Sequence, residues 1–348
     1  MSFSEIFSGK MYDFASPFEY STQLNRLITN LGLFTEQPHA TNRIAIDKIM
    51  IAGDYFAPEK SMYAQSDWNS ASRPTFGTEL YDMVYTNSIN SVTSLDLEQY
   101  RARGHIDIGD QVSLAISDFS DAQYSQVSNS VEMALIGALL DLRVPSKYAE
   151  QGDLDFLAGA DKTRYEMDVS AENNIFQQLS EINRIMNVNL GEGLAQQKKG
   201  MVVLAAGEAA TSLRYHESVK DFMVYTLSVN DADNFATRVK ADNPALESWT
   251  LNGITVIDVT GITTITDRIG KDGFVCIPVM SAESQAFTLH TGKGVRHAVQ
   301  GKGNSLMQQY VTVDQQWGFP TVSTESAFLP VVNIPTAIVF GSITGFGS

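Results

Sequence analysis

The stretch GMVVLAAGEAATSLRYHESVKDFM, residues 200–223, has the outline of a strand that turns directly into a helix. Its apolar run ends at Ala205-Ala206-Gly207, and a helical pattern with an acidic first turn follows. Some turns of this kind bind phosphate with the free N–H groups of the helix N-terminus. Here neither G-x-x-x-x-G-K-[ST] nor G-x-G-x-x-G is present, and Glu208 would repel a phosphate at the helix start. The stretch therefore predicts scaffold and not a nucleotide site.

The segments before this unit predict strands first and then a long helix. Residues 43–51 and 78–87 have strand patterns, and they are joined by a long segment, 52–77, rich in Gly, Pro, Ser and Asn. A connection of that length inside a domain usually has a function. Apolar residues at spacings of three and four predict a helix within residues 111–143, with Ser120 or Asp121 as its N-cap.

Further elements follow along the chain. A second helix is expected from about residue 170 to Gly191, and the acidic segment 151–169 before it reads as a loop. Asn252-Gly253 predicts a hairpin turn between two β-rich runs. More strand signals occupy residues 273–280, 285–293 and 310–342. The fold class is therefore mixed α+β, with strands at both ends and helices between them.

Composition narrows the classes of function. The 348 residues are 43% hydrophobic and 18% charged, which is enough apolar material for a sizeable core. We find neither an apolar run that approaches the roughly 20 residues of a membrane span nor a secretory signal, so we expect no membrane partner. The net charge of −16 is opposite to that of most duplex-DNA binders. The same charge suits a surface that encloses DNA without adsorbing it.

No set of residues predicts catalysis or metal binding. The five histidines lack H-x-x-x-H spacing, and the acidic residues of 153–168 lack the order of a calcium loop. Cys276, the single cysteine, lies in an apolar strand pattern that favours inert packing. Lys293, Arg296, His297 and Lys302 form a local basic patch, suited to an acidic neighbouring subunit or nucleic acid, or else exposed in a loop. We expect no enzymatic activity, no cofactor and no metal.

The order of these elements resembles the major capsid protein of tailed bacteriophages, in the branch of the lambda-like major head protein (the Hong Kong ninety-seven fold). The resemblance is one of pattern and order over nearly the whole chain, in segments 41–49, 83–104, 131–145, 200–223, 251–259, 271–280 and 316–342. It implies a structural protein that self-assembles in the host cytoplasm into an icosahedral shell. The shell would enclose phage double-stranded DNA without sequence-specific binding and would become part of the virion.

The resemblance also implies a division of the chain. Residues 1–44 would be an N-terminal arm and 45–95 an extended β-hairpin loop. Residues 96–199 and 310–348 would form a peripheral domain with a long spine helix, and 200–309 an axial domain. The candidate inter-subunit contacts lie in the arm, the extended loop and the basic patch: Tyr12, Phe14, Phe18, Asp54, Tyr55, Trp68, Arg73, Phe76, Lys293, Arg296 and Lys302.

The implied partners are copies of the same chain in hexamers and pentamers, a portal, a separate scaffolding protein and possible decoration proteins. Alternatives remain open at this point. An encapsulin-like compartment shell would have the same fold around enzymes, and an acidic hydrolase would use a carboxylate pair from residues 153–172. A tail-tube subunit should be shorter and should lack the long helix.

Overall fold

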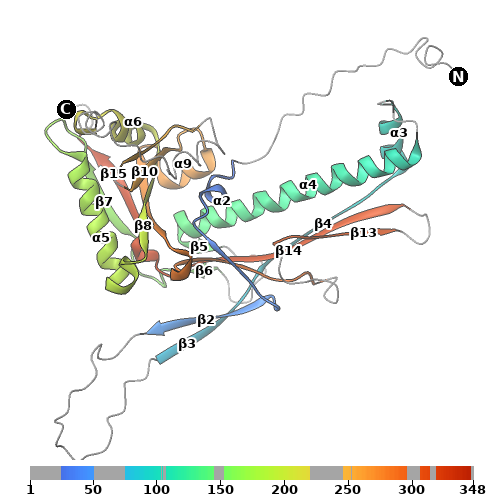
Figure 1. Cartoon of the computed structure of the whole chain (residues 1–348), viewed down its shortest axis with the longest axis horizontal. Helices are drawn as coiled ribbons and strands as arrows, with labels where there is room; N and C mark the ends of the chain where they lie inside the picture. Colours follow the sequence, from blue (N-terminus) through green and yellow to red (C-terminus); the bar gives the residue numbers. More distant parts are fainter. Residues whose placement is uncertain are drawn as a thin grey trace, which may run out of the picture.

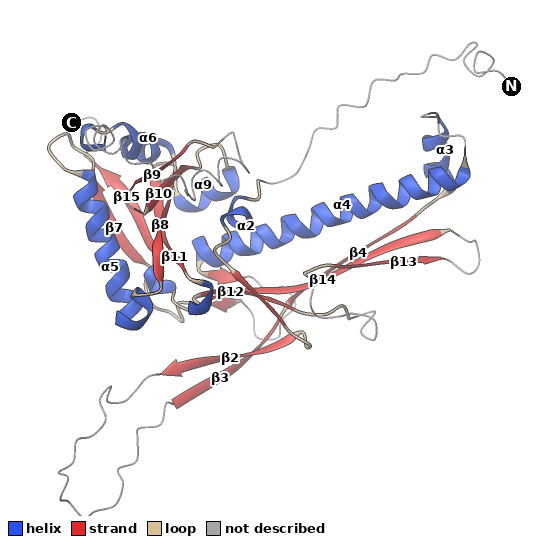
Figure 2. Cartoon of the chain, viewed as in Figure 1, coloured by secondary structure: helices blue, strands red, loops and turns tan. Residues whose placement is uncertain are grey.

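The computed structural model describes residues 25–50, 75–102, 104, 107–144, 153–219, 246–251, 253–295, 306–313 and 319–345. In these residues helices and strands are mixed along the chain, which confirms the α+β class (Figure 2). The helices are α2 (Leu27–Leu31), α3 (Ser94–Ala102), α4 (Ile108–Ile136), α5 (Ile175–Ala195), α6 (Gly207–Tyr215) and α9 (Thr263–Ile269). A π-helical turn, Gly137–Asp141, continues α4, and short 3-10 turns occupy Ala282–Ser284 and Pro335–Ala337.

A six-stranded sheet is the centre of one half of the molecule (Figure 1). Its order is β7 (Thr163–Asp168), β15 (Val339–Thr344), β11 (Gly273–Met280), β8 (Lys198–Ala205), β10 (Ile254–Asp258) and β9 (Ser248–Leu251). Side chains alternate along β8: Met201 and Val203 pack with α5 and α6, whereas Val202 and Leu204 join the core that includes α9 and the end of α4. Because both faces are covered from Met201 to Ala205, this part of the strand is apolar throughout.

The turn from β8 to α6 is scaffold, as the sequence predicts. Gly207 has φ +55, and a Cβ at this position would lie 2.3 Å from the backbone oxygen of Lys271, so only glycine fits. The first N–H groups of α6 already have acceptors within the chain: Gly207 donates to Thr260 Oγ1 (2.9 Å) and Glu208 to Asp272 Oδ1 (3.1 Å). A phosphate would find these donors occupied.

A five-stranded sheet and the long helix α4 make the other half. The sheet has the order β1 (Thr35–Pro38), β12 (Phe287–Thr291), β14 (Pro320–Val332) and β13 (Gln308–Val313), and β4 (Val84–Ser91) also pairs with β14. The 29 residues of α4 span about 43 Å and run along this sheet (Figure 1). Two small sheets complete the description: β2 (Arg43–Met50) with β3 (Thr75–Asp82), and β5 (Arg143–Val144) with β6 (Leu154–Asp155).

Three local predictions are wrong. The long helix begins at Ile108 and not near Ser120 or Asp121, because the Asp107 side chain accepts from the N–H of Asp110 and caps it there. Gly191 (φ 73) interrupts the second helix, yet helical structure continues to Ala195. The acidic segment is only partly loop, since Thr163–Asp168 forms strand β7 and buries Met167 against α5.

The pairing of strands crosses the division of the chain that the resemblance implies. β12, from the segment expected to be axial, pairs with β14 and so lies in the sheet under α4. β7 and β15, from segments expected to be peripheral, lie in the sheet that contains β8. The exact boundaries of the two units therefore stay a prediction, and the sheets give the physical grouping.

Candidate assembly interface

The β2–β3 hairpin leaves the body of the molecule (Figure 1), whereas β4, which also lies in the predicted loop 45–95, pairs with β14 in the five-stranded sheet. Eight residue pairs join β2 and β3, from Arg43 opposite Asp82 to Met50 opposite Thr75. At the root, Arg43 donates to both carboxylate oxygens of Asp82, at 2.6 and 3.1 Å. This hydrogen bond from Arg43 is the main reason that the pKa of Asp82 is lowered. The bidentate pair closes the hairpin where it meets the body.

Of the predicted contact residues, Lys293 is the one whose side chain lies in the described part of the chain, and it lies at the root of this hairpin. Its backbone N–H donates to Asn42 Oδ1 at 2.9 Å, and Asn42 directly precedes β2. The neighbouring Gly292 packs so closely that a Cβ would lie 2.4 Å from Asn42 Oδ1 and 2.7 Å from the sulfur of Met83. Met83 directly follows β3 and Asn42 directly precedes β2, so Gly292 and Lys293 contact both strands of the hairpin at its root.

The other predicted contact residues, or their side chains, lie outside the residues that the structure describes. Phe76 belongs to β3, but its side chain lies outside the described residues. Outside them altogether lie Tyr12, Phe14, Phe18, Asp54, Tyr55, Trp68, Arg73, Arg296 and Lys302. Whether the arm, the loop and the basic patch meet a neighbour therefore stays a prediction.

The layer formed by α4 over β4, β14 and β13 has a polar contact along much of its length. Between Ile108 and Gln126 the buried residues of α4 are Gln111, Ala115 and Gln123, none of them a large apolar side chain. Gln123 donates to Asn90 Oδ1 (2.9 Å) and to the Val322 carbonyl (3.1 Å), and its own carbonyl accepts from Thr324 Oγ1 (2.5 Å). Hydrogen bonds thus position the helix on the sheet where little apolar area is buried.

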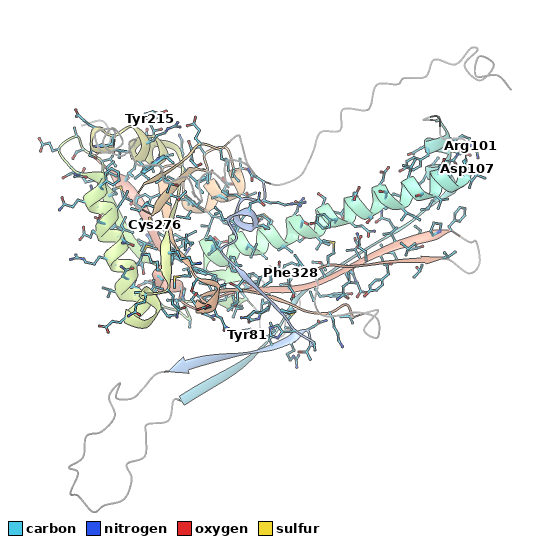
Figure 3. All side chains as sticks on the ribbon, in the orientation of Figure 1. Tyr81, Arg101, Asp107, Tyr215, Cys276 and Phe328 are labelled. Carbon is cyan, nitrogen blue, oxygen red and sulfur yellow. The ribbon has the colours of Figure 1, made fainter. Side chains whose placement is uncertain are left out.

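The same layer exposes large apolar side chains. On it and on the adjoining α3 these are Tyr85, Ile89, Leu95, Ile108, Tyr124, Met133, Val311 and Val313. Ile89 is 56% exposed, and Val313, on the edge strand β13, is 63% exposed. None of the described α3 residues is buried, and Arg101 of α3 lies close to Asp107, the N-cap at the far end of α4 (Figure 3). A thin layer with apolar groups outside is typical of a surface that contacts other chains.

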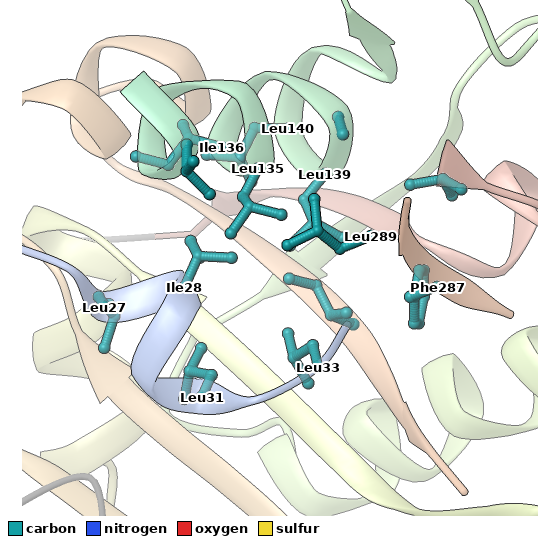
Figure 4. Packing of buried hydrophobic residues seen from close by; sticks show 14 of the residues in the cluster. Leu27, Ile28, Leu31, Leu33, Leu135, Ile136, Leu139, Leu140, Phe287 and Leu289 are labelled. Atoms are coloured by element: carbon teal, nitrogen blue, oxygen red, sulfur yellow. The ribbon is translucent and has the colours of Figure 1, made fainter. Parts of the chain in front are cut away.

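The described part of the N-terminal segment is anchored on the other end of α4. Leu27, Ile28 and Leu31 of α2 pack against Leu135 and Leu139 in the main core (Figure 4). The fully buried carboxylate of Glu132 accepts from the N–H of Ile28 at 2.8 Å, and from Thr29 as well. Burial of Glu132 raises its pKa, although these hydrogen bonds and the nearby Arg26 act in the opposite direction. Helix α2 is therefore held firmly on the end of α4.

A pair of histidines joins this N-terminal segment to the sheet. His39 Nε2 lies 2.8 Å from His290 Nδ1, and the other ring nitrogen of His290 lies 3.0 Å from Thr288 Oγ1. β1 runs parallel to β12 beside this pair. Burial, followed by the charge of His39, lowers the pKa of His290 to about 4. The His39–His290 contact thus helps to hold β1 on β12, and His290 is neutral in this contact.

The remaining signals for other classes of protein have structural roles. Cys276 is fully buried in β11, and burial raises the pKa of its thiol (Figure 3). In the acidic segment, Asp155 lies 3.8 Å from Arg143, and Asp168 accepts from the N–H of Ser170. Across the described ranges, no three His, Cys, Asp or Glu side chains are grouped so that they could hold a metal. Over the same ranges, we find no helix long and apolar enough to cross a membrane.

The fold matches that of solved capsid structures. The capsid protein of Myoviridae phage XM1 aligns over 99% of this chain and 99% of its own, with a TM-score of 0.52 and 11% identity. The mature capsid of bacteriophage PhiM1 aligns over 97% of this chain and 93% of its own, with a TM-score of 0.52 and 10% identity. No protein-family model and no curated protein matches the sequence. The chain therefore has the fold of tailed-phage major capsid proteins, which confirms the fold that the order of elements implies.

Proposed function

We propose that this chain is the major capsid protein of a tailed bacteriophage, a structural protein and not an enzyme. The observation that carries the proposal is the match of the capsid fold over nearly the full length of both chains. Because the match includes the hairpin and the long helix as well as the two sheets, it covers the parts that would reach other subunits. The acidic hydrolase has no comparable support.

The surfaces described above support self-association. Between Ile108 and Gln126, α4 buries little apolar area on its sheet, and this layer carries exposed residues such as Ile89 and Val313. Copies of the chain would cover these groups in closed rings, hexamers and pentamers, of an icosahedral shell. The predicted arm and loop residues, from Tyr12 to Phe76, would add contacts to the same neighbours.

The charge of the chain supports enclosed DNA as the content of the shell. A net charge of −16 disfavours adsorption of phosphates on the inner surface, so the DNA would be held by confinement and not by sequence-specific binding. Assembly would take place in the host cytoplasm with a scaffolding protein and a portal, and decoration proteins would add to the finished shell.

Electron microscopy of the chain, expressed alone and with its neighbouring genes, tests this proposal. We expect closed shells, or rings of five and six subunits, and we expect nuclease-protected DNA in shells made during infection. Shells filled with a protein cargo and free of DNA would favour the encapsulin-like alternative. A uniform monomer under every condition would contradict the proposal.

A further inference from the structure

A groove of about 480 Å³ lies between helix α5 and the first residues of β8 and β10. Its lining includes Phe176, Ser180, Asn183, Asn187, Lys198 and Lys199. The groove belongs to the unit of the six-stranded sheet, so it is separate from the hairpin root and from the layer under α4. Its size exceeds that of a single carboxylate and suits several side chains of a bound segment.

Helix α5 presents two different faces. The apolar face, which includes Ile175, Leu179 and Ile182, is fully buried in the core. The groove face follows the spacing of a second helical stripe, with Ser180, Asn183 and Asn187 next to Lys198. Apart from Phe176, which packs against the core at the start of this stripe, the groove face of α5 is polar.

Lys198 is a half-buried cation in this groove. Its ammonium group donates to Asn183 Oδ1 and to Asn187 Oδ1, the latter at 2.9 Å. Neither acceptor is charged, and in the described part of the chain the groove lining contains no Asp or Glu and Lys198 forms no ion pair. Consistent with this, burial lowers the pKa of Lys198 to about 8.

The two asparagines complete a set of donors. An ammonium group has only hydrogens to offer, so both asparagines must turn their oxygens toward Lys198. Their Nδ2 groups therefore point away from it, and no hydrogen bond among the described residues uses either Nδ2. The groove lining thus holds the Lys198 cation and two amide groups whose Nδ2 donors are unused among the described residues, and donors of both kinds can bind a carboxylate.

We propose that this groove binds a carboxylate-bearing segment from a neighbouring copy of the chain. The inference deepens the proposed function, because it assigns one contact of the shell. In an assembly of chains that each have 40 acidic and 24 basic residues, contacts need local cations to offset repulsion. The half-buried Lys198, with the exposed Lys199 next to it in the lining, suits one or two carboxylates, whereas a nucleic acid needs a longer row of cations.

The isosteric variant Asn187→Asp is the central test. It places a carboxylate of the chain itself beside Lys198 without changing the packing, so the groove loses its uncompensated charge. We expect the melting temperature of the subunit to stay equal or rise, and the affinity for a labelled hexaglutamate peptide to fall about tenfold, measured by fluorescence anisotropy. Lys198→Gln should lower the affinity for the hexaglutamate peptide to a similar extent. Lys271→Gln, an exposed lysine outside the groove, is the matched control and should bind like wild type.

Sedimentation velocity on the same proteins separates the two proposals. We expect Asn187→Asp to reduce the assembled fraction while wild type and Lys271→Gln assemble. Equal assembly of wild type and Asn187→Asp would overturn the proposal that the groove binds a neighbouring copy, and so would hexaglutamate that binds no tighter than hexaglutamine. Either result would leave the proposed function unaffected. A wild type that stays monomeric would contradict the proposed function and, with it, the neighbouring copy as occupant. Binding of DNA with the same dependence on Lys198 would overturn the choice of an acidic segment.

Discussion

Glu132 and Thr29 are 103 positions apart in the sequence, and a single carboxylate oxygen of Glu132 accepts two hydrogen bonds from Thr29, from the backbone N–H at 3.0 Å and from Oγ1 at 2.6 Å. The other oxygen accepts from the N–H of Ile28. These are free N–H groups of the first turn of α2, which have no partner within the helix itself. The long helix thus caps the short one, and residues 28 and 29 are fixed to the part of the chain that we propose to carry the shell contacts.

Removal of this cap should destabilise the subunit. Glu132→Ala leaves buried N–H groups without an acceptor, so we expect the free energy of unfolding to fall by about 2–4 kcal/mol. Denaturant unfolding followed by circular dichroism measures this change. Asp121→Ala, on an exposed position of the same helix, is the control and should change stability by less than about 0.5 kcal/mol. Equal stabilities of the two variants would show that the cap contributes little.

The polar contact between α4 and its sheet should be equally specific. Gln123→Ala removes the partner of Asn90 and of Thr324 in a buried place, and we expect a loss of about 2–3 kcal/mol in the free energy of unfolding. Gln126→Ala, an exposed glutamine of the same helix, should be nearly neutral. If Gln123→Ala unfolds at the same denaturant concentration as Gln126→Ala, the hydrogen bonds do not position the helix.

The histidine pair predicts a loss of stability in acid. The folded protein holds the pKa of His290 at about 4, below the ordinary value of about 6.5, so the unfolded chain binds the proton more tightly. The contribution of His290 is therefore complete above pH 6.5 and is lost as the pH falls toward 4, by up to about 3 kcal/mol. Unfolding free energies of wild type and His290→Gln, measured between pH 7 and pH 4, should converge toward low pH. Parallel curves would contradict this role of His290.

Elements with a local pattern could be predicted from the sequence, and those that depend on distant partners could not. The Asn252-Gly253 signal gave the correct connection of β9 to β10, because such turns form from their own residues. The start of α4 was placed too late because the residues that it buries before Val127, Gln111, Ala115 and Gln123, include no large apolar side chain that would give a helical pattern. β7 was missed because acidic composition concealed a strand that forms by pairing with β15, more than 170 residues later.

The candidate site was predictable to a smaller extent. The sequence indicated the hairpin and the position of Lys293 in a basic segment, but only the fold brings Lys293 beside Asn42. Asn183, Asn187 and Lys198 gave no signal, since they are ordinary polar residues on a helix and a strand until folding places them in one groove. Contacts between subunits also depend on the surface of a second chain. The sequence pattern of one chain therefore does not indicate which of its exposed residues a neighbouring subunit covers.

The hairpin offers the most direct test of the proposed shell. Met50 and Thr75 are directly opposite each other at the end of β2 and β3, so residues 51–74 can be replaced by a two-residue Asn-Gly turn that keeps the register. We expect this shortened chain to fold with a melting temperature close to that of wild type, because the two sheets and their cores are unchanged. We also expect it to form no stable shell, because the segment that would overlap a neighbour is gone. Electron microscopy and sedimentation velocity measure assembly, and the full-length chain prepared in parallel is the control. Shells of normal size and stability from the shortened chain would show that the extended loop is not an assembly contact.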